Sequence, residues 1–251
     1  MQIAAHDVLI VVDIQNDFCP GGQLAVADGD SVIEPIHSIA PLFSHIILTQ
    51  DWHPANHTSF AANQPGKKPY DSIQLSYGPQ TLWPTHCVQN TQGAEFHPRL
   101  HLPQAELILR KGFHAQIDSY SAFFENDRKT PTGLAGYLRE RGLTRIFLAG
   151  LAYDYCVAYS ALDARRLGLP VFIVRDACRA IDLNGSAAMM EAEFDKAGVS
   201  IIESSELADF AAHESADEGI RQGISDANEG RTRPVREFLS EFERRNLRES
   251  K

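Results

Sequence analysis

The 251-residue sequence has little cysteine, no long apolar run and a shortage of positive charge. Its four cysteines, Cys19, Cys87, Cys156 and Cys178, are too few and too widely spaced for a disulfide-stapled fold. No apolar stretch approaches the roughly 20 residues of a membrane-spanning helix, and the first residues lack the basic segment of a signal peptide. The 23 basic against 33 acidic residues give a net charge of -10, which disfavours binding to nucleic acid or to an anionic membrane. We therefore expect a cytoplasmic protein without a nucleic-acid or membrane partner.

Several short, continuously apolar segments end in a polar residue. These segments are 8–12 before Asp13, 46–48 before Asp51, 107–109 before Lys111, and 146–148 before Gly150 and Cys156. Runs that are apolar throughout are typical of parallel strands buried on both faces. Because ligands of open α/β sheets bind beyond the carboxyl ends of the strands, we expect these polar residues to share one pocket.

Strand-like and helix-like patterns alternate along the chain, which predicts an α/β fold built from right-handed crossovers. Strands are predicted near 7–12, 45–49, 106–110, 145–149, 170–174 and 200–202. Helices are predicted over 31–41, 131–141, 155–167 and 185–197, the third with Asp154 in a capping position. The interval from Asp51 to Pro103 holds more than half of the 13 prolines and is interpreted as a long functional loop.

The composition changes near residue 210 to charged and small residues, so we predict a main domain over 1–209 and an extension over 210–251. Four apolar residues at helical spacing predict a helix from Pro234 to Arg245; they are Val235, Phe238, Leu239 and Phe242. This helix would dock on its own domain or on a partner subunit, which makes a homo-oligomer one option, and disorder is the remaining alternative.

Cys156 is the candidate nucleophile. It follows a buried strand and falls in the first turn of a predicted helix, where free N–H groups and the helix dipole favour an anion and would lower the pKa of the thiol. Asp13 is the candidate proton shuttle, because no histidine is obviously placed for that role. Lys111 would supply the neighbouring cation. Taken singly, each residue has an ordinary structural interpretation, and the combination is what indicates catalysis.

Asp51, His53 and His86 form a candidate metal site. Residues two apart in an extended segment point the same way, so Asp51 and His53 can bind one ion together. One carboxylate and two imidazoles favour Zn, Fe or Mn over Ca or Mg. His57 and Ser59 are nearby candidates for ligands or for residues that support the ligands.

The chain resembles the nicotinamidases of the isochorismatase-like cysteine hydrolase superfamily over about residues 6–205. The resemblance is carried by six segments in order: Val12-Asp13-Ile14-Gln15-Asn16-Asp17-Phe18, Asp51-Trp52-His53-Pro54, Leu82-Trp83-Pro84-Thr85-His86-Cys87, Lys111-Gly112, Asp118-Ser119-Tyr120-Ser121-Ala122-Phe123 and Gly150-Leu151-Ala152-Tyr153-Asp154-Tyr155-Cys156. It implies a three-layer sandwich in which helices cover both faces of a six-stranded parallel sheet.

The resemblance also implies an activity, the hydrolysis of nicotinamide to nicotinate and ammonia in NAD salvage, with pyrazinamide as a related substrate. It implies the catalytic residues Asp13, Lys111 and Cys156, and an oxyanion hole formed by the N–H groups of Ala152 and Cys156 beside a cis peptide bond after Leu151. It places one divalent transition metal ion on Asp51, His53 and His86. The implied substrate contacts are Phe18, Leu24, Trp83 and Tyr120.

Other functions remain open from the sequence. A carbamoyl or ureido amide hydrolase of the same superfamily would keep Asp13, Lys111 and Cys156 without needing the metal motif, and an isochorismatase would lack the cysteine. A non-hydrolytic alternative is a metal-dependent redox sensor or binding protein that uses Cys87 and Cys156.

Overall fold

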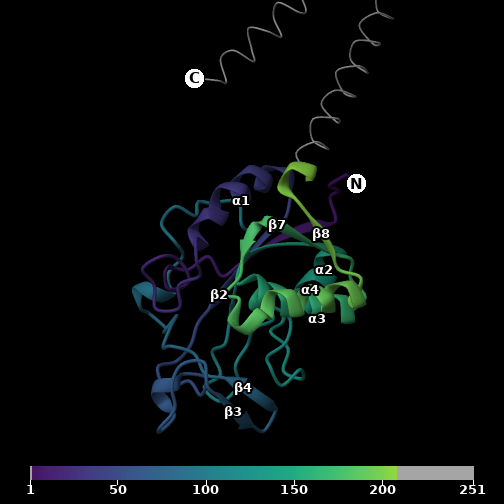
Figure 1. The fold of residues 1–251 in the computed structure, drawn as a ribbon. Helices are drawn as coiled ribbons and strands as arrows, with labels where there is room; N and C mark the ends of the chain where they lie inside the picture. The colour runs from purple at the N-terminus through teal and green to yellow at the C-terminus, as the bar shows by residue number, and fades with distance from the viewer. Residues whose placement is uncertain (1, 208–251) are drawn as a thin grey trace, which may run out of the picture. The chain divides into compact units, whose positions relative to one another are not determined.

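The structure, a computed structural model, describes residues 2–207 (Figure 1). The predicted boundary between residues 209 and 210 and the predicted helix from Pro234 to Arg245 lie outside the described residues. Within the described part of the chain, no helix is long and apolar enough to cross a membrane.

A six-stranded parallel sheet lies at the centre of the domain, in the order β5-β2-β1-β6-β7-β8. The strands are β1 (Asp7–Val12), β2 (Ile46–Asp51), β5 (Leu107–Lys111), β6 (Arg145–Leu151), β7 (Val171–Arg179) and β8 (Ser200–Ile202). All six predicted strands are confirmed. β7 continues to Arg179, well beyond the predicted end at 174, because the register between β6 and β7 shifts after Leu148 and pairing resumes at Gly150.

Helices cover both faces of the sheet, so the predicted three-layer architecture is confirmed. The helices are α1 (Ile33–Ile39), α2 (Leu134–Arg141), α3 (Ala158–Arg166) and α4 (Ser186–Ala197). The alternation of side chains along β1 divides the core: Leu9 and Val11 pack in one cluster with α1, whereas Val8 and Ile10 pack in the other cluster with α2, α3 and α4. Burial on both faces explains why β1 is apolar throughout.

The predicted helix bounds need correction. α1 is shorter than the predicted 31–41, because 3-10 turns occupy Gly29–Val32 and Ala40–Leu42 on either side of it. α2 begins at Leu134 rather than 131, after Gly133 in a left-handed conformation. The predicted helix 155–167 is two elements: a π-helical turn at Tyr153–Val157, and then α3. Cys156 therefore lies in the π-helical turn, before the regular helix begins.

The interval from Asp51 to Pro103, interpreted as a loop, contains an antiparallel hairpin. β3 (Ser72–Leu75) pairs with β4 (Gly78–Thr81), and the pair forms a two-stranded sheet of its own, drawn at the bottom of Figure 1. The sequence pattern missed it because β4 contains Gly78 and Pro79, which are depleted in strands, and because most hairpin side chains are at least partly exposed.

Candidate active site

The site lies between β1 and β6, where the order of the strands in the sheet reverses. From β1 the chain continues to β2 and β5 on one side, and β6 returns to pair with the other side of β1. Asp13 follows β1 and Cys156 follows β6, while Asp51 and Lys111 occupy paired positions at the ends of β2 and β5. Strand order therefore brings together residues that are far apart in sequence, at the edge where α/β sheets bind ligands.

Lys111 is the centre of this group, and its ammonium is fully buried. Nζ lies 2.8 Å from Asp13 Oδ2 and forms a second ion pair with Asp51 Oδ1. It also donates to Cys156 Sγ over 3.3 Å and to the carbonyl oxygen of Ser119 over 3.0 Å. A carboxylate oxygen of Asp13, one of Asp51 and the Cys156 sulfur all lie within 4.8 Å of one another.

Burial and this ion cluster shift the pKa values of the group. Burial opposes the charge of Lys111, but the carboxylates of Asp13 and Asp51 outweigh it, so the pKa of Lys111 is raised well above its ordinary value. Burial also raises the pKa of Asp13, and Lys111 only partly offsets this. For Asp51 burial acts in the same direction, but Lys111 and His53 outweigh it and lower its pKa.

The pKa of the Cys156 thiol is raised well above its ordinary value by burial, with Lys111 acting in the opposite direction. The expectation that the helix terminus lowers this pKa is therefore wrong. Cys156 is almost fully buried and lies beside two carboxylates, and these effects outweigh the N–H groups of a short π-helical turn. Burial thus favours the neutral form of the Cys156 thiol.

The segment before Cys156 has an unusual backbone. The peptide bond between Leu151 and Ala152 is cis, as the family resemblance implies. Asp154 does not cap the following helix: its carboxylate accepts hydrogen bonds from the N–H groups of Ile181 and Asp182 and from the Ser186 hydroxyl. Asp154 instead ties the π-helical turn to the segment that follows β7.

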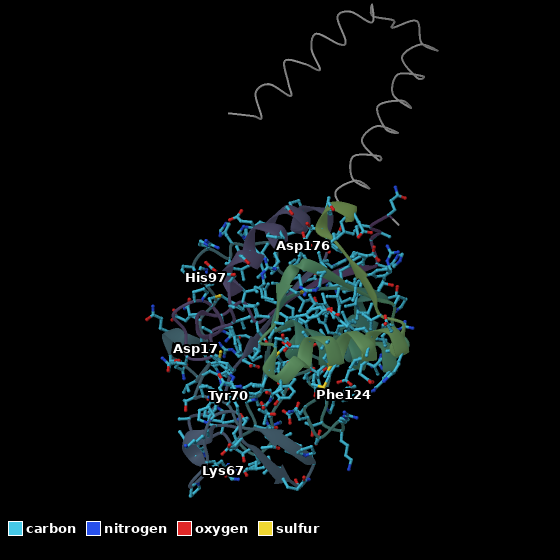
Figure 2. All side chains as sticks on the ribbon, in the orientation of Figure 1. Asp17, Lys67, Tyr70, His97, Phe124 and Asp176 are labelled. Carbon is cyan, nitrogen blue, oxygen red and sulfur yellow. The ribbon has the colours of Figure 1, made fainter. Side chains whose placement is uncertain are left out.

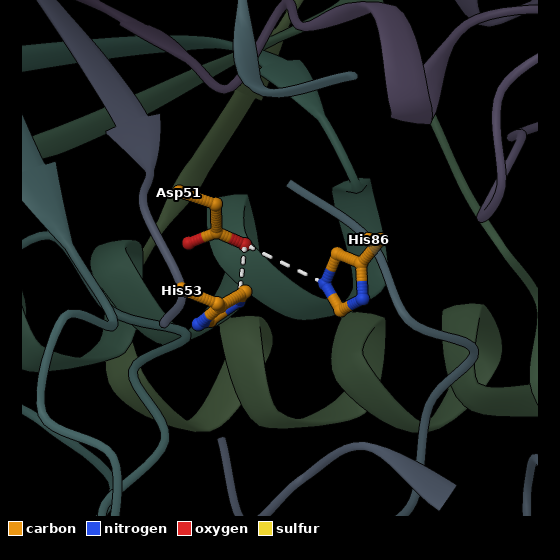
Figure 3. A group of neighbouring side chains, drawn as sticks. All are labelled: Asp51, His53 and His86. Atoms are coloured by element: carbon orange, nitrogen blue, oxygen red, sulfur yellow. Dashed lines mark ion pairs between the residues drawn. The ribbon is translucent and has the colours of Figure 1, made fainter. Parts of the chain in front are cut away.

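Asp51, His53 and His86 converge as a buried group that fits a metal ion (Figure 3). Asp51 Oδ2 lies 3.5 Å from His53 Nε2 and 3.9 Å from His86 Nε2. The other ring nitrogens are engaged by backbone: His53 Nδ1 lies 2.8 Å from the carbonyl oxygen of Gly112, and His86 Nδ1 lies 2.8 Å from that of Pro84. Burial lowers the pKa of His86 to about 4. Anchored Nδ1 atoms leave both Nε2 atoms directed at the shared carboxylate, the usual arrangement of metal-binding histidines.

His57 and Ser59 lie beside this group. His57 Nδ1 is 2.7 Å from Ser59 Oγ, and the His57 ring packs 4.4 Å from the His53 ring. His57 and Asp118 also form a group with His53 whose ligand atoms lie within 4.8 Å of one another. His57 thus packs against His53, and Ser59 contacts His57.

One cavity joins the thiol to the candidate metal site. All four predicted substrate contacts, Phe18, Leu24, Trp83 and Tyr120, line it. So do Asp118, Tyr155 and Ile181, which the sequence reasoning did not assign to the site. Asp118 and Tyr155 lie inside segments that carry the family resemblance, and this resemblance could have indicated them as site residues. Ile181 lies in a segment that has no such resemblance.

The isochorismatase domain matches residues 7–206. The chain belongs to the isochorismatase family. A nicotinamidase of Acinetobacter baylyi is 56% identical over 81% of this chain and 95% of that protein. Two solved structures of this family are also similar. The Acinetobacter baumannii nicotinamidase/pyrazinamidase has a TM-score of 0.81 and 53% identity, over 82% of this chain and 100% of that one.

The pyrazinamidase of Pyrococcus horikoshii, solved in complex with zinc, has a TM-score of 0.65 and 35% identity, over 79% of this chain and 99% of that one. Among the superfamily activities left open by the sequence, the comparisons thus favour nicotinamidases. All four cysteines of this isochorismatase-family chain are buried and free.

Proposed function

We propose that this protein is a metal-containing cysteine amidohydrolase that converts nicotinamide to nicotinate and ammonia in NAD salvage, in the cytoplasm, and also accepts pyrazinamide. The observation that carries the proposal is the single cavity in which Cys156, with Lys111 behind it, meets the group formed by Asp51, His53 and His86. A carbamoyl amide hydrolase would have no use for that second group. The identity to nicotinamidases supports the same activity.

Asp51, His53 and His86 would hold one divalent ion of Zn, Fe or Mn. The fit is supported by their burial, by the anchored Nδ1 atoms and by the mixed carboxylate and imidazole donor set. When bound, the ion would supply a Lewis-acid contact to the ring nitrogen of the pyridine and so direct the carboxamide at the thiol. The zinc complex of the pyrazinamidase relative supports zinc among the three.

Asp13 would act first as the general base. Its carboxylate takes the thiol proton of Cys156, and the sulfur attacks the carboxamide carbon. Burial raises the pKa of Asp13, which makes its carboxylate a better proton acceptor. The N–H groups of Ala152 and Cys156 would hold the oxyanion that forms. Lys111 keeps the buried negative charge paired throughout.

Breakdown of this intermediate needs the proton again. Asp13 returns it to the leaving nitrogen, ammonia departs, and a thioester remains on Cys156. Asp13 then takes a proton from water, which attacks the thioester and releases nicotinate, and the thiol is restored. Phe18, Trp83 and Tyr120 would enclose the ring, with Leu24 at the edge of the pocket.

The test is ammonia release from nicotinamide by the purified full-length protein, with metal content assayed on the same sample. The Cys156→Ala variant should retain its metal and lose turnover by about a thousandfold or more, because the nucleophile is gone while the metal group is intact. Absence of turnover in a metal-loaded wild-type sample would overturn the proposal. Turnover that survives in Cys156→Ala would overturn the assignment of the nucleophile.

A further inference from the structure

The hairpin formed by β3 and β4 places one buried amide against the wall of the active-site cavity. Gln80, in β4, is 1% exposed, although most of its neighbours in the hairpin are at least partly exposed. Figure 2 shows the side chains that fill the region above the hairpin, where Tyr70 is labelled, and the Tyr70 ring packs 6.2 Å from that of Trp83. Tyr70, which lies just before the hairpin, thus packs against Trp83 of the cavity wall.

Both ends of the Gln80 amide are engaged. Nε2 donates to Asp118 Oδ2 over 2.8 Å and to the carbonyl oxygen of Thr81 over 2.7 Å, and it lies 3.1 Å from the Tyr120 hydroxyl. Oε1 accepts from the hydroxyl of Tyr77 over 3.0 Å and from Asn126 Nδ2 over 3.3 Å. The orientation of the amide is therefore determined, because a flipped amide would set its oxygen against a carboxylate and a carbonyl.

Two of these partners, Asp118 and Tyr120, line the cavity. The Tyr120 hydroxyl also accepts a hydrogen bond from Trp83 Nε1 over 3.0 Å, so Gln80 and Trp83 hold this oxygen from two sides. Asp118 is 2% exposed, and Gln80 is the side-chain donor to its Oδ2. Gln80 thus supports two residues of the cavity wall and does not itself line the cavity.

We propose that Gln80 is a positioning residue that sets the affinity of the cavity for the pyridine ring by holding Asp118 and Tyr120 in place. This inference rests on the proposed function for its substrate. Gln80 touches the cavity wall rather than Cys156, Asp13 or Lys111, so its loss should act on binding of the ring more than on the chemical step.

Gln80→Glu is the decisive variant, because it keeps the shape and replaces the donor by a carboxylate directed at Asp118. We expect KM for nicotinamide to rise about tenfold and kcat to change less than about threefold, since buried donors that contact a charge contribute strongly. Gln74→Glu, on the exposed strand of the same hairpin, is the matched control, and both constants should stay near wild type.

The split between KM and kcat separates positioning from a general loss of structure. A loss of folded protein lowers kcat and leaves KM unchanged, whereas displacement of Asp118 and Tyr120 raises KM and leaves kcat nearly unchanged. A KM ratio of Gln80→Glu to wild type near one, or a defect in kcat alone, would overturn the proposal.

Two further measurements test the role of Gln80 if the first variant does not fold or the protein releases no ammonia. If Gln80→Glu does not fold, Tyr77→Phe is the second variant. It removes a donor to Gln80 Oε1 and also the hydroxyl that accepts the Asp118 N–H, so KM should rise about threefold in a folded protein; an unchanged KM would overturn the proposal. If wild type releases no ammonia, the proposed function fails, but Trp83 still reports on Gln80 through Tyr120. The tryptophan emission should then change in Gln80→Glu and not in Gln74→Glu, and identical spectra would overturn the inference.

Discussion

Thr49, in β2, donates its hydroxyl hydrogen to Asp13 Oδ1 over 2.6 Å, and its Oγ1 accepts the backbone N–H of Asp13 over 3.2 Å. Thr49 thus holds both the backbone and the carboxylate of the candidate general base. Asp13 has a positive φ of 49°, which a side chain that hydrogen-bonds locally helps to maintain.

Thr49→Val removes the donor at nearly constant volume. A donor stabilises the carboxylate form, so its loss should raise the already raised pKa of Asp13 further. The base form then exists only at higher pH. We expect the acid limb of the kcat/KM profile to move to higher pH, and kcat/KM near neutrality to fall about tenfold. The exposed Thr144→Val is the control, and coincident pH profiles would contradict the role of Thr49.

Glu106 lies in a surface network that should contribute to stability in a defined pH window. Burial opposes its charge, but hydrogen bonds from His45 and Tyr137 outweigh this, and the pKa of Glu106 is lowered from 4.5. A lowered pKa in the folded state stabilises the fold above about pH 4.5, and this contribution is lost as pH falls through the lowered value.

Glu106→Gln should therefore lower Tm at neutral pH by about 2 °C, and the difference from wild type should shrink as pH falls below about 4.5. Thermal unfolding measured across this range checks the prediction. Glu193→Gln, which removes an exposed pair with Lys196, should show a smaller effect at every pH. A Tm difference for Glu106→Gln that persists at low pH would indicate lost packing instead of lost charge.

Much of the site could be predicted because it follows apolar strand segments, although β5 is partly exposed. Asp13, Asp51 and Lys111 each end an apolar run, and parallel pairing brings such ends to one edge whatever the lengths of the connections. Asp51 and Lys111 also lie directly opposite each other in the pairing of β2 with β5. The pattern of burial along the sequence thus carries enough information for this part of the site.

The remaining features depend on tertiary contacts without a local pattern. Gln80 lies in a hairpin that contains Gly78 and Pro79, and its burial arises only because Asp118 and Tyr120 from another segment meet it. The sequence around Cys156 reads like the start of an ordinary α-helix. A π-helical turn differs from an α-helical turn by one extra residue, and this difference leaves no pattern in the sequence. The raised pKa of Cys156 follows from its burial beside carboxylates, and its position near the start of a helix does not reveal that burial.

Gly112 gives a test of the metal group that leaves its three ligands unchanged. Its φ is +67°, and a Cβ there would lie 2.4 Å from His53 Cε1, while its carbonyl oxygen is the partner of His53 Nδ1. Gly112→Ala must therefore displace the His53 ring. We expect zinc affinity to fall about tenfold to a hundredfold, as when the supporting contacts of a metal-binding histidine are lost, and activity at limiting zinc to fall with it.

Gly66→Ala is the matched control for this variant. Gly66 has a similar φ of +73°, but a Cβ there meets nothing within 4 Å. Both variants therefore carry the backbone strain of a side chain at positive φ, and only Gly112→Ala adds the contact with His53. Zinc titration of the two proteins separates these effects. Equal zinc affinities would show that His53 does not hold the ion, whereas a loss confined to Gly112→Ala would tie metal binding to the orientation of His53.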